Sequence, residues 1–434
     1  MQKLKLLIPQ RLKNYYHLLQ AIAANILYAF PSRKLTVIGV TGTNGKTTTC
    51  QMIAKILEES GAKVAMISTI NFKISEKEWV NKTKFTTMSS KSLQKFIKKA
   101  VDAKCKYLIL ETSSHALDQY RTWGVKYKTA VITNVTREHL DYHKTIDEYR
   151  IAKYKLFCCA QVGIVNLEMK RPKDYLLYNI PEKYGYTKND VDCSGFDCGH
   201  VIAVKAKNIK TNVDGSEFEV EGVKYKLNLP GEFNIENALA AICVGLSEHI
   251  SPETMSRALE KIKVVPGRMD RVPNDKNLNI IIDYALTPDS LEKLYSMIST
   301  SRTSDVQNTE GHRMSKIIAV FGSCGDRDRG KRPLMGEIVD KYADYIIVTN
   351  EDPYTEDPQK IIDEVASGVK NKKENENFWK ILDRREAIKK ALQLAKPHDI
   401  FLVTGKGAEE MMMIGSKMIP WNDKKVILEE LKKL

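Results

Sequence analysis

The sequence predicts an α/β fold with parallel sheets in two successive domains. The first observation is a β-branched strand pattern, a glycine-rich loop and a helical pattern that follow one another near the N-terminus, as in a strand–helix–strand unit. The second is a renewed alternation of strand and helix patterns after Pro273. The third is the length of 434 residues, which is enough for two or three domains with cores of their own.

The first half of the chain begins with the clearest of these units. A strand is expected at Lys34–Val40, a helix at Lys46–Ser60 that Gly61 stops, and a second strand at Lys63–Ile70. Further apolar strand patterns lie at Tyr107–Glu111, Thr129–Asn134 and Gly163–Leu167. Strands alternating with helices predict a parallel sheet.

A stretch with different character follows at residues 171–230. It carries turn signals at Val213-Asp214-Gly215 and at Glu221-Gly222. We expect short β-hairpins here, as a small addition to the first domain.

The second half predicts a separate Rossmann-like domain. Its strands are expected at Asn279–Tyr284, Lys316–Phe321, Tyr345–Thr349 and Asp399–Thr404. Its helices are expected at Pro288–Ser299, Gly330–Lys341, Pro358–Lys370 and Arg384–Ala395. The polar stretch Ser301–Ser315 is expected to be a flexible loop. The chain then divides into an N-terminal helical segment (1–34), a central domain (35–270) and a C-terminal domain (271–434).

The net charge and the cysteine spacing bear on the partners of the protein and on the redox state of its thiols. Lysine and arginine (68) outnumber aspartate and glutamate (54), a formal net charge of +14 at pH 7. This charge fits a lysine-rich soluble surface, or an anionic partner such as nucleotide phosphates, an acidic substrate or a membrane surface. The eight cysteines contain no CxxC pair, which indicates reduced thiols. We expect a cytoplasmic protein, monomeric and without a nucleic-acid partner.

The N-terminal segment contains a largely apolar stretch, Tyr15–Phe30, with basic residues such as Lys13 and Arg33 on both sides. As one helix it would be about 24 Å long, too short to span a bilayer core of roughly 30 Å. Packing on the protein's own core is favoured, and weak contact with a membrane surface is the alternative.

The most specific local pattern is Thr41-Gly42-Thr43-Asn44-Gly45-Lys46-Thr47-Thr48, placed between a strand and a helix. Glycines allow the backbone to wrap a phosphate chain, and the N–H groups at the start of the helix point at the anion. Lys46 would neutralise the β- and γ-phosphates of ATP, and the Thr47 hydroxyl would bind Mg²⁺. The predicted first domain is therefore a P-loop ATPase domain, although Val40 stands where the strict pattern has glycine.

This loop resembles that of Mur ligases and folylpolyglutamate synthases, and further blocks occur in the order of that family. They are Glu111–Leu117, Thr133–His143, Leu229–Ala238, Gly267–Asp270 and Asp283-Tyr284-Ala285. The blocks Gly325–Pro333 and Asp383–Ile388 resemble the branch that adds the third residue of the cell-wall peptide. The resemblance covers residues 35–434.

The resemblance implies an ATP-dependent acid–amino-acid ligase. ATP would phosphorylate a carboxylate to an acyl phosphate, which an amine then attacks. The implied partners are a UDP-N-acetylmuramoyl-L-alanyl-D-glutamate-like acceptor and a free amino acid, with ATP and Mg²⁺. The implied catalytic residues are Lys46, Glu111, His139 and Lys153. Metal ligands would be Thr47, Glu111, His139 and Lys153, the last as a carbamylated lysine.

The resemblance also assigns substrate contacts. ATP would be bound by Gly42, Thr43, Asn44, Gly45, Lys46, Thr47, Thr48, Asn234, Asn237, Arg268 and Asp283. The acceptor would be bound by Thr86, Thr87, Ser113, Gln119 and Arg121. The amino acid would be bound by Arg327, Glu351, Asp352, Pro353, Tyr354, Gly405 and Glu409.

Several positions depart from the family pattern. About 34 residues precede the first strand, too few for the uridine-nucleotide-binding domain of these enzymes. Met88 follows the threonine pair in place of proline, Leu286 replaces a histidine, and Ala408 replaces another. Tyr354 replaces the arginine that reads the distal carboxylate of diaminopimelate.

These changes bear on the amino acid. The carboxylates of Glu351, Asp352 and Glu409 would attract a distal ammonium, so a basic amino acid such as lysine or ornithine is expected. The alternative is that Arg327 or another arginine reads diaminopimelate from a different direction.

Two other functions stay open from the sequence. One is a folylpolyglutamate or cyanophycin-type ligase of the same superfamily, which would differ in its acceptor. The other is a nucleotide-dependent binding protein without ligase activity, against which the presence of all four implied catalytic residues argues.

Overall fold

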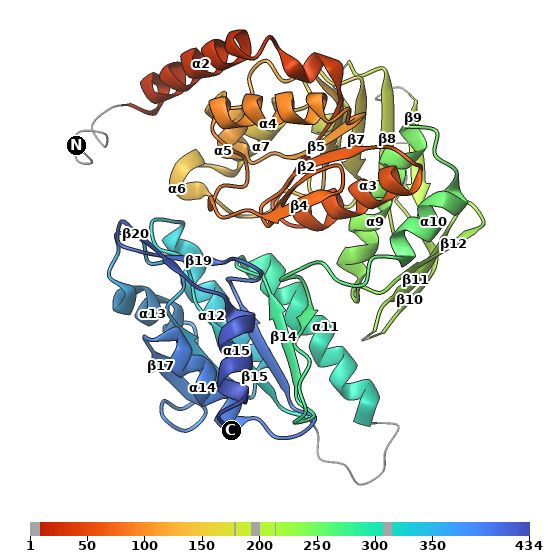
Figure 1. Cartoon of the computed structure of the whole chain (residues 1–434). Helices are drawn as coiled ribbons and strands as arrows, with labels where there is room; N and C mark the ends of the chain where they lie inside the picture. The colour runs from red at the N-terminus through yellow and green to blue at the C-terminus, as the bar shows by residue number, and fades with distance from the viewer. Residues whose placement is uncertain (1–8, 178, 192–199, 213, 307–314) are drawn as a thin grey trace.

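The computed structural model describes residues 9–177, 179–191, 200–212, 214–306 and 315–434. Figure 1 shows a central domain, drawn red to green, above a C-terminal domain drawn in green-blue to blue. Each has a mostly parallel sheet with helices on both faces, so the predicted α/β class with two parallel-sheet domains is confirmed.

The central domain is built on a nine-stranded sheet of order β4-β3-β2-β5-β1-β6-β7-β8-β9. Its strands are β1 (Thr36–Thr41), β2 (Val64–Ile67), β3 (Asn71–Ile74), β4 (Lys77–Val80), β5 (Tyr107–Glu111), β6 (Tyr127–Ile132), β7 (Val162–Asn166), β8 (Glu182–Thr187) and β9 (Val201–Lys205). Strand β1 pairs in parallel with β5 and β6, so the phosphate loop after β1 lies between the ends of both neighbours. Ligands of open α/β sheets bind at this carboxyl edge.

Helices cover both faces of the central sheet. They are α3 (Lys46–Glu59), α4 (Ser90–Asp102), α5 (Ser114–Asp118), α6 (Leu140–His143), α7 (Ile146–Tyr154), α8 (Lys173–Leu176), α9 (Glu232–Ser247) and α10 (Pro252–Glu260), with the 3₁₀ turn η1 at Pro31–Lys34. One apolar core joins α3, α9 and α10 to the sheet, and a second joins α4, α7 and α8 to the opposite face.

The prediction for residues 171–230 is right for its second half only. Strands β10 (Lys207–Thr211), β11 (Ser216–Val220) and β12 (Val223–Leu227) form an antiparallel sheet, and the Glu221-Gly222 turn joins β11 to β12. Strands β8 and β9 instead extend the main sheet in parallel, because Tyr184 and Tyr186 bury their rings in its core. Residue 213 of the other predicted turn lies outside the described residues.

The C-terminal domain has a six-stranded sheet of order β13-β14-β18-β15-β16-β17. Its strands are β13 (Asp270–Arg271), β14 (Asn279–Asp283), β15 (Ile317–Phe321), β16 (Tyr345–Thr349), β17 (Phe378–Ile381) and β18 (Ile400–Thr404), and β19 (Met411–Ile414) pairs with β20 (Lys417–Pro420). Its helices are α11 (Pro288–Val306), α12 (Arg332–Tyr342), α13 (Pro358–Ala366), α14 (Arg384–Leu394) and α15 (Asp423–Leu431), with the turn η2 at Arg329–Lys331.

Two predicted boundaries shift in this domain. Helix α11 continues to Val306, so the first part of the predicted loop Ser301–Ser315 is helical, and residues 307–314 lie outside the described part of the chain. Strand β13 pairs with β14, which places Asp270 in the C-terminal sheet rather than at the end of the central domain.

Helix α2 (Gln10–Leu27) packs along the central domain beside α4. Its residues Ala21, Ala24 and Asn25 face the central domain and are buried, and Asn25 Nδ2 donates to the Trp123 carbonyl at 2.7 Å. The helix begins and ends earlier than predicted, since Phe30 has a left-handed backbone (φ 48°). Packing on the protein's own core is thus confirmed.

The outward side of α2 is apolar. It exposes Leu12, Tyr15, Tyr16, Leu19, Ile26 and Leu27. Contact of this face with a membrane surface stays a prediction. Among the described helices none is long and apolar enough to cross a bilayer.

We expect Asn25→Ala to loosen α2. Asn25 is 0% exposed, and its loss leaves the Trp123 carbonyl without a donor, at a cost of about 1–3 kcal/mol. Amide hydrogen exchange of residues 10–27 would measure this as faster exchange. Leu19→Ala is the control, because Leu19 is 65% exposed and its exchange pattern should stay unchanged. Equal protection in both variants would show that other contacts hold the helix.

Candidate active site

The glycine-rich loop lies between β1 and α3 at the carboxyl edge of the central sheet. Gly45 has a φ of 82°, and a Cβ there would collide with the Asn237 side chain, so glycine is required. The loop is held by Asn134: the Thr43 N–H donates to its carbonyl, and the Asn44 N–H donates to its side-chain oxygen, each at 2.9 Å. The start of α3 therefore faces an open cleft, as phosphate binding requires.

Lys46 is folded back over this loop. Its ammonium donates to the carbonyl oxygens of Gly42 (3.2 Å) and Thr43 (2.8 Å). Burial lowers the pKa of Lys46, and the nearby Glu111 carboxylate opposes that shift. Phosphate oxygens could replace the two carbonyls as acceptors, so the side chain is placed for the predicted role.

The Glu111 carboxylate, at the end of β5, accepts hydrogen bonds from two threonines. It accepts from the Thr47 hydroxyl at 3.0 Å and from the N–H and hydroxyl of Thr69 at 2.7 and 2.8 Å. Arg268 lies on the other side of Thr47, with Nη2 at 3.4 Å from its hydroxyl. A carboxylate beside a hydroxyl is a hard oxygen donor set, which fits Mg²⁺.

His139 lies at the edge of the same cleft in a left-handed backbone conformation (φ 58°). Its ring meets that of His115 edge to face at 4.6 Å between centroids. Burial holds the pKa of His139 well below its usual value, so the imidazole is neutral. Among the described residues no hydrogen-bond partner meets its buried Nδ1, and a neutral imidazole with an unpaired nitrogen can be a metal ligand.

Lys153 lies behind the phosphate loop rather than in the cleft lining. Its amine donates to the Gly42 carbonyl at 2.8 Å, sits 4.3 Å from the Tyr149 ring centroid, and belongs to a residue that is 1% exposed. Burial, followed by repulsion from Lys46, lowers the pKa of Lys153 well below its usual value. This shift favours the neutral amine, which is the form that reacts with CO₂.

The other predicted ATP contacts line the cleft together. Asn237 donates to the Asn234 side-chain oxygen at 3.2 Å on the first turns of α9. The Arg268 guanidinium stacks over the Tyr284 ring at 4.3 Å. Asp283 accepts two backbone N–H groups at the end of β14, while burial raises its pKa. Adenosine binding by this group stays a prediction.

Four of the five predicted acceptor residues lie close together. Thr86 lines the cleft, and Thr87, Ser113 and Arg121 form a bonded group behind it. Arg121 donates to the Thr87 carbonyl at 2.5 Å, and the Ser113 N–H donates to the Thr87 hydroxyl at 3.1 Å. Gln119 follows α5 and is not among the described residues that line the cleft.

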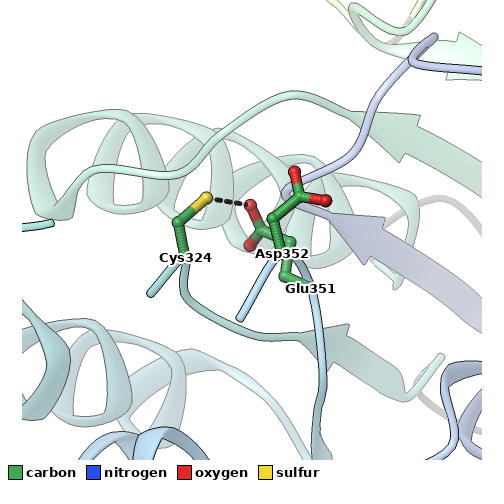
Figure 2. Close-up of side chains that lie close together, drawn as sticks. All are labelled: Cys324, Glu351 and Asp352. Atoms are coloured by element: carbon green, nitrogen blue, oxygen red, sulfur yellow. Dashed lines mark hydrogen bonds between the residues drawn. The ribbon is translucent and has the colours of Figure 1, made fainter. Parts of the chain in front are cut away.

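The predicted amino-acid residues lie across the cleft on the C-terminal domain. Figure 2 shows Cys324 and Glu351 side by side, with the thiol donating to Glu351 Oε1 at 2.9 Å. Burial, and then the nearby Asp352 carboxylate, raise the pKa of Glu351. Gly405 lies against the Glu351 carboxylate, where a Cβ would not fit. The three residues in Figure 2 each offer one possible metal-ligand atom, and these atoms lie within 4.8 Å of one another. Asp352 is already neutralised by Lys84 and Lys406, so this cluster lacks the free negative charge that would attract a metal ion.

Two lysines neutralise Asp352 and Glu409. Lys84 Nζ lies 2.6 Å from Asp352 and also pairs with Glu409. Lys406 Nζ lies 3.0 Å from Asp352 and 2.6 Å from Glu409. The expectation that three carboxylates are available to a distal ammonium is therefore wrong in its premise, because Asp352 and Glu409 are paired with lysines and Glu351 accepts from the Cys324 thiol.

Arg327 differs from its basic neighbours. Its guanidinium stands over the Tyr354 ring at 5.4 Å and lines the cleft. Within the described residues it has no ion-pair partner, and its hydrogen bond is a long one of 3.4 Å to the Asp326 carbonyl. Arg327 is thus a cation available to an anionic group of a ligand.

Several site residues had no predicted role. The Lys331 ammonium pairs with Glu138 at 3.0 Å across the domains, and Asn44 donates to Asp289 at 2.9 Å. Glu138 and Lys331 lie inside the sequence blocks described above, which is a signal that could have found them. Lys84 precedes the threonine pair, and its sequence context gives no indication of a cross-domain contact.

A phosphate loop that faces a second α/β domain over a shared cleft is the arrangement of a nucleotide-dependent enzyme. Residues 40–245 match the Mur ligase middle domain, and residues 267–407 match the Mur ligase, glutamate ligase domain. The chain belongs to the Mur ligase family, whose members are ATP-dependent C–N ligases of peptidoglycan synthesis.

Named relatives agree with the branch suggested by the sequence. The chain is 38% identical to a UDP-N-acetylmuramoyl-L-alanyl-D-glutamate--2,6-diaminopimelate ligase of Clostridium botulinum, over 95% of this chain and 81% of the relative. It is 36% identical to a UDP-N-acetylmuramyl-tripeptide synthetase of a Roseiflexus species, over 92% and 79%. A solved 2,6-diaminopimelate ligase structure matches with a TM-score of 0.57 and 29% identity, over 92% of this chain and 78% of that one.

Lys46→Met should abolish most turnover. The substitution keeps the length of the side chain but removes the charge next to the phosphate loop, and we expect a loss of about 100-fold or more with weaker ATP binding. Phosphate release and nucleotide titration measure the two effects. Lys55→Met on the same helix is the control, since Lys55 is partly exposed and pairs only with Glu58 among the described contacts. Near-normal turnover by folded Lys46→Met would refute the phosphate-loop assignment.

Lys153→Ala should be nearly inactive and partly rescued by short carboxylic acids. A carbamylated lysine supplies a carboxylate, and a small acid can enter the space that the side chain leaves. Phosphate release with and without added acetate or propionate tests this. Lys155→Ala is the matched control two residues further on, at the C-cap of α7, because Lys155 is partly exposed and paired with Asp118. Loss of activity that no acid restores, with no ¹³C carbamate signal under ¹³CO₂, would contradict carbamylation.

Proposed function

We propose that this chain adds one amino acid to a UDP-N-acetylmuramoyl-L-alanyl-D-glutamate-like acceptor, with release of ADP and phosphate. One observation carries the proposal: a single cleft joins the phosphate loop, Thr86 of the acceptor side and Arg327 of the amino-acid side. The names of relatives at 36–38% identity support the choice of acceptor.

The ATP side would work by positioning and charge neutralisation. The N–H groups at the start of α3 and Lys46 would hold the phosphates. Thr47, Glu111 and His139 are the residues that would hold Mg²⁺, which supplies positive charge to the transferring phosphoryl group when bound. Lys153, if carbamylated, would place a further carboxylate behind the loop.

On the acceptor side, Thr86 would orient the glutamate carboxylate towards the γ-phosphate, and Arg121 fixes the backbone of this segment through the Thr87 carbonyl. The carboxylate oxygen forms a bond to phosphorus as the bond to ADP breaks. The amine nitrogen of the amino acid then bonds to the acyl carbon, and phosphate leaves. Both partners are held in one cleft, which makes the second step effectively intramolecular.

The free guanidinium of Arg327 would bind a carboxylate of the incoming amino acid. Asp352 and Glu409 are already paired with lysines, so neither carboxylate is left to balance the single positive charge at the end of a basic side chain. Diaminopimelate ends in an ammonium and a carboxylate, which together are net neutral, and is therefore the better candidate, in agreement with the names of several relatives. This replaces the expectation of lysine or ornithine.

The test is ATP-dependent ligation with a panel of amino acids. We expect kcat/KM for meso-diaminopimelate to exceed that for L-lysine, and Arg327→Ala to lower it by about tenfold or more, mainly through KM. Arg329→Ala is the control, because Arg329 is exposed and pairs with Glu356. Ligation of glutamate to a folate acceptor, with none on the muramoyl acceptor, would favour the folylpolyglutamate alternative instead.

A further inference from the structure

Lys84 makes a contact that the proposed reaction does not explain. It belongs to the central domain, yet its ammonium lies between two carboxylates of the C-terminal domain, Asp352 and Glu409. The side chain is only 9% exposed. An ammonium in this position occupies the space between the carboxylates of the amino-acid pocket, where the ammonium of a basic amino acid would otherwise bind.

The segment that carries Lys84 is built to present it. Asn81 is buried and donates to the carbonyls of Ser68 and Phe85, both at 3.0 Å, while its oxygen accepts from the Thr83 N–H at 2.9 Å. Lys84 itself has a left-handed backbone (φ 60°), which residues with side chains adopt rarely. The turn therefore directs Lys84 away from its own domain and across the cleft.

The balance of charge at this position depends on Lys84. Asp352 and Glu409 carry two negative charges, which Lys84 and Lys406 together balance. Without Lys84, one negative charge is left unpaired at the edge of the pocket. Lys406 cannot leave, because it is buried and also donates to the Met411 carbonyl at 2.8 Å.

We propose that Lys84 is a specificity-determining residue whose ammonium, held between Asp352 and Glu409, repels amino acids whose side chain ends in a net cation, such as L-lysine and L-ornithine. Diaminopimelate also ends in an ammonium, but the carboxylate on the same carbon makes its end group net neutral and can face Lys84. The inference rests on the proposed function. It assigns selection against basic amino acids to the central domain, in a segment that leads directly into the acceptor-side residue Thr86. Discrimination is thus achieved by a like charge as well as by attraction.

The experiment measures kcat/KM for L-lysine and for meso-diaminopimelate in the full chain and in Lys84→Met, which keeps the length and removes the charge. We expect the ratio of L-lysine to meso-diaminopimelate to rise by about tenfold or more. Lys84→Arg restores a cation and should return the ratio towards that of the unaltered chain. Lys82→Met, an exposed lysine of the same segment, is the matched control and should leave the ratio unchanged.

A merely structural bridge gives a different result. Its loss would lower kcat/KM for both amino acids by the same factor and leave the ratio unchanged, which overturns the inference while the proposed function stands. If Lys84→Met does not fold, Lys84→Gln takes its place, and the affinity of the ATP-bound variant for L-lysine is measured by calorimetric titration. Tighter binding of L-lysine than in the unaltered chain supports the inference, and equal binding overturns it. If the unaltered chain ligates no amino acid to the muramoyl acceptor, the proposed function itself fails.

Discussion

The site depends on the buried ion pair between Lys331 and Glu138, which joins the two domains. Lys331 also donates to the Leu286 carbonyl at 2.9 Å, so one ammonium ties the Thr133–His143 block of the central domain to two segments of the C-terminal domain. Removing two charges from water costs several kcal/mol, and their attraction offsets that cost only in a good geometry. The pair therefore contributes more to fixing how the two domains meet around the shared cleft than to net stability.

Lysines in and around this cleft differ in charge because their neighbours differ. Burial lowers the pKa of Lys46 and Lys153, and no carboxylate contacts either amine directly. Lys331 and Lys406 are equally buried, but the adjacent carboxylates raise the pKa of both. Neighbouring carboxylates, rather than depth, thus decide the direction in which the pKa of a buried amine shifts. Lys153 has the lowered pKa that carbamylation by CO₂ requires, whereas the raised pKa values of Lys331 and Lys406 favour fixed cations between domains and in the pocket.

The sequence predicts the ATP side of the site well because its information is local. A β-strand, a turn that only glycine can make at Gly45, and a helix start are encoded within a dozen residues, and the structure places the predicted phosphate-loop residues together. Contacts such as Lys84 with Asp352 join residues that are hundreds of positions apart, so no local pattern indicates them. The same limit explains why β8 and β9 were expected to form hairpins: their short strands look alike whether they pair with each other or with a distant sheet edge.

Three of the departures from the family pattern share a location, whereas Met88 lies in the central domain. Tyr354, Ala408 and Leu286 all lie on the C-terminal side of the cleft, where the amino acid is expected, and the implied catalytic residues of the ATP side are all present. Leu286 shows how a change of side chain can leave the framework intact, because its backbone carbonyl still accepts from Lys331. Tyr354 likewise gives up a guanidinium but keeps a planar ring, and Arg327 stacks on it from a neighbouring loop. Arg327 belongs to the Gly325–Pro333 block shared with the family branch, so one cation stays beside the position where Tyr354 stands. The pocket can therefore change side chains on this wall while the phosphate-loop residues of the opposite wall stay the same.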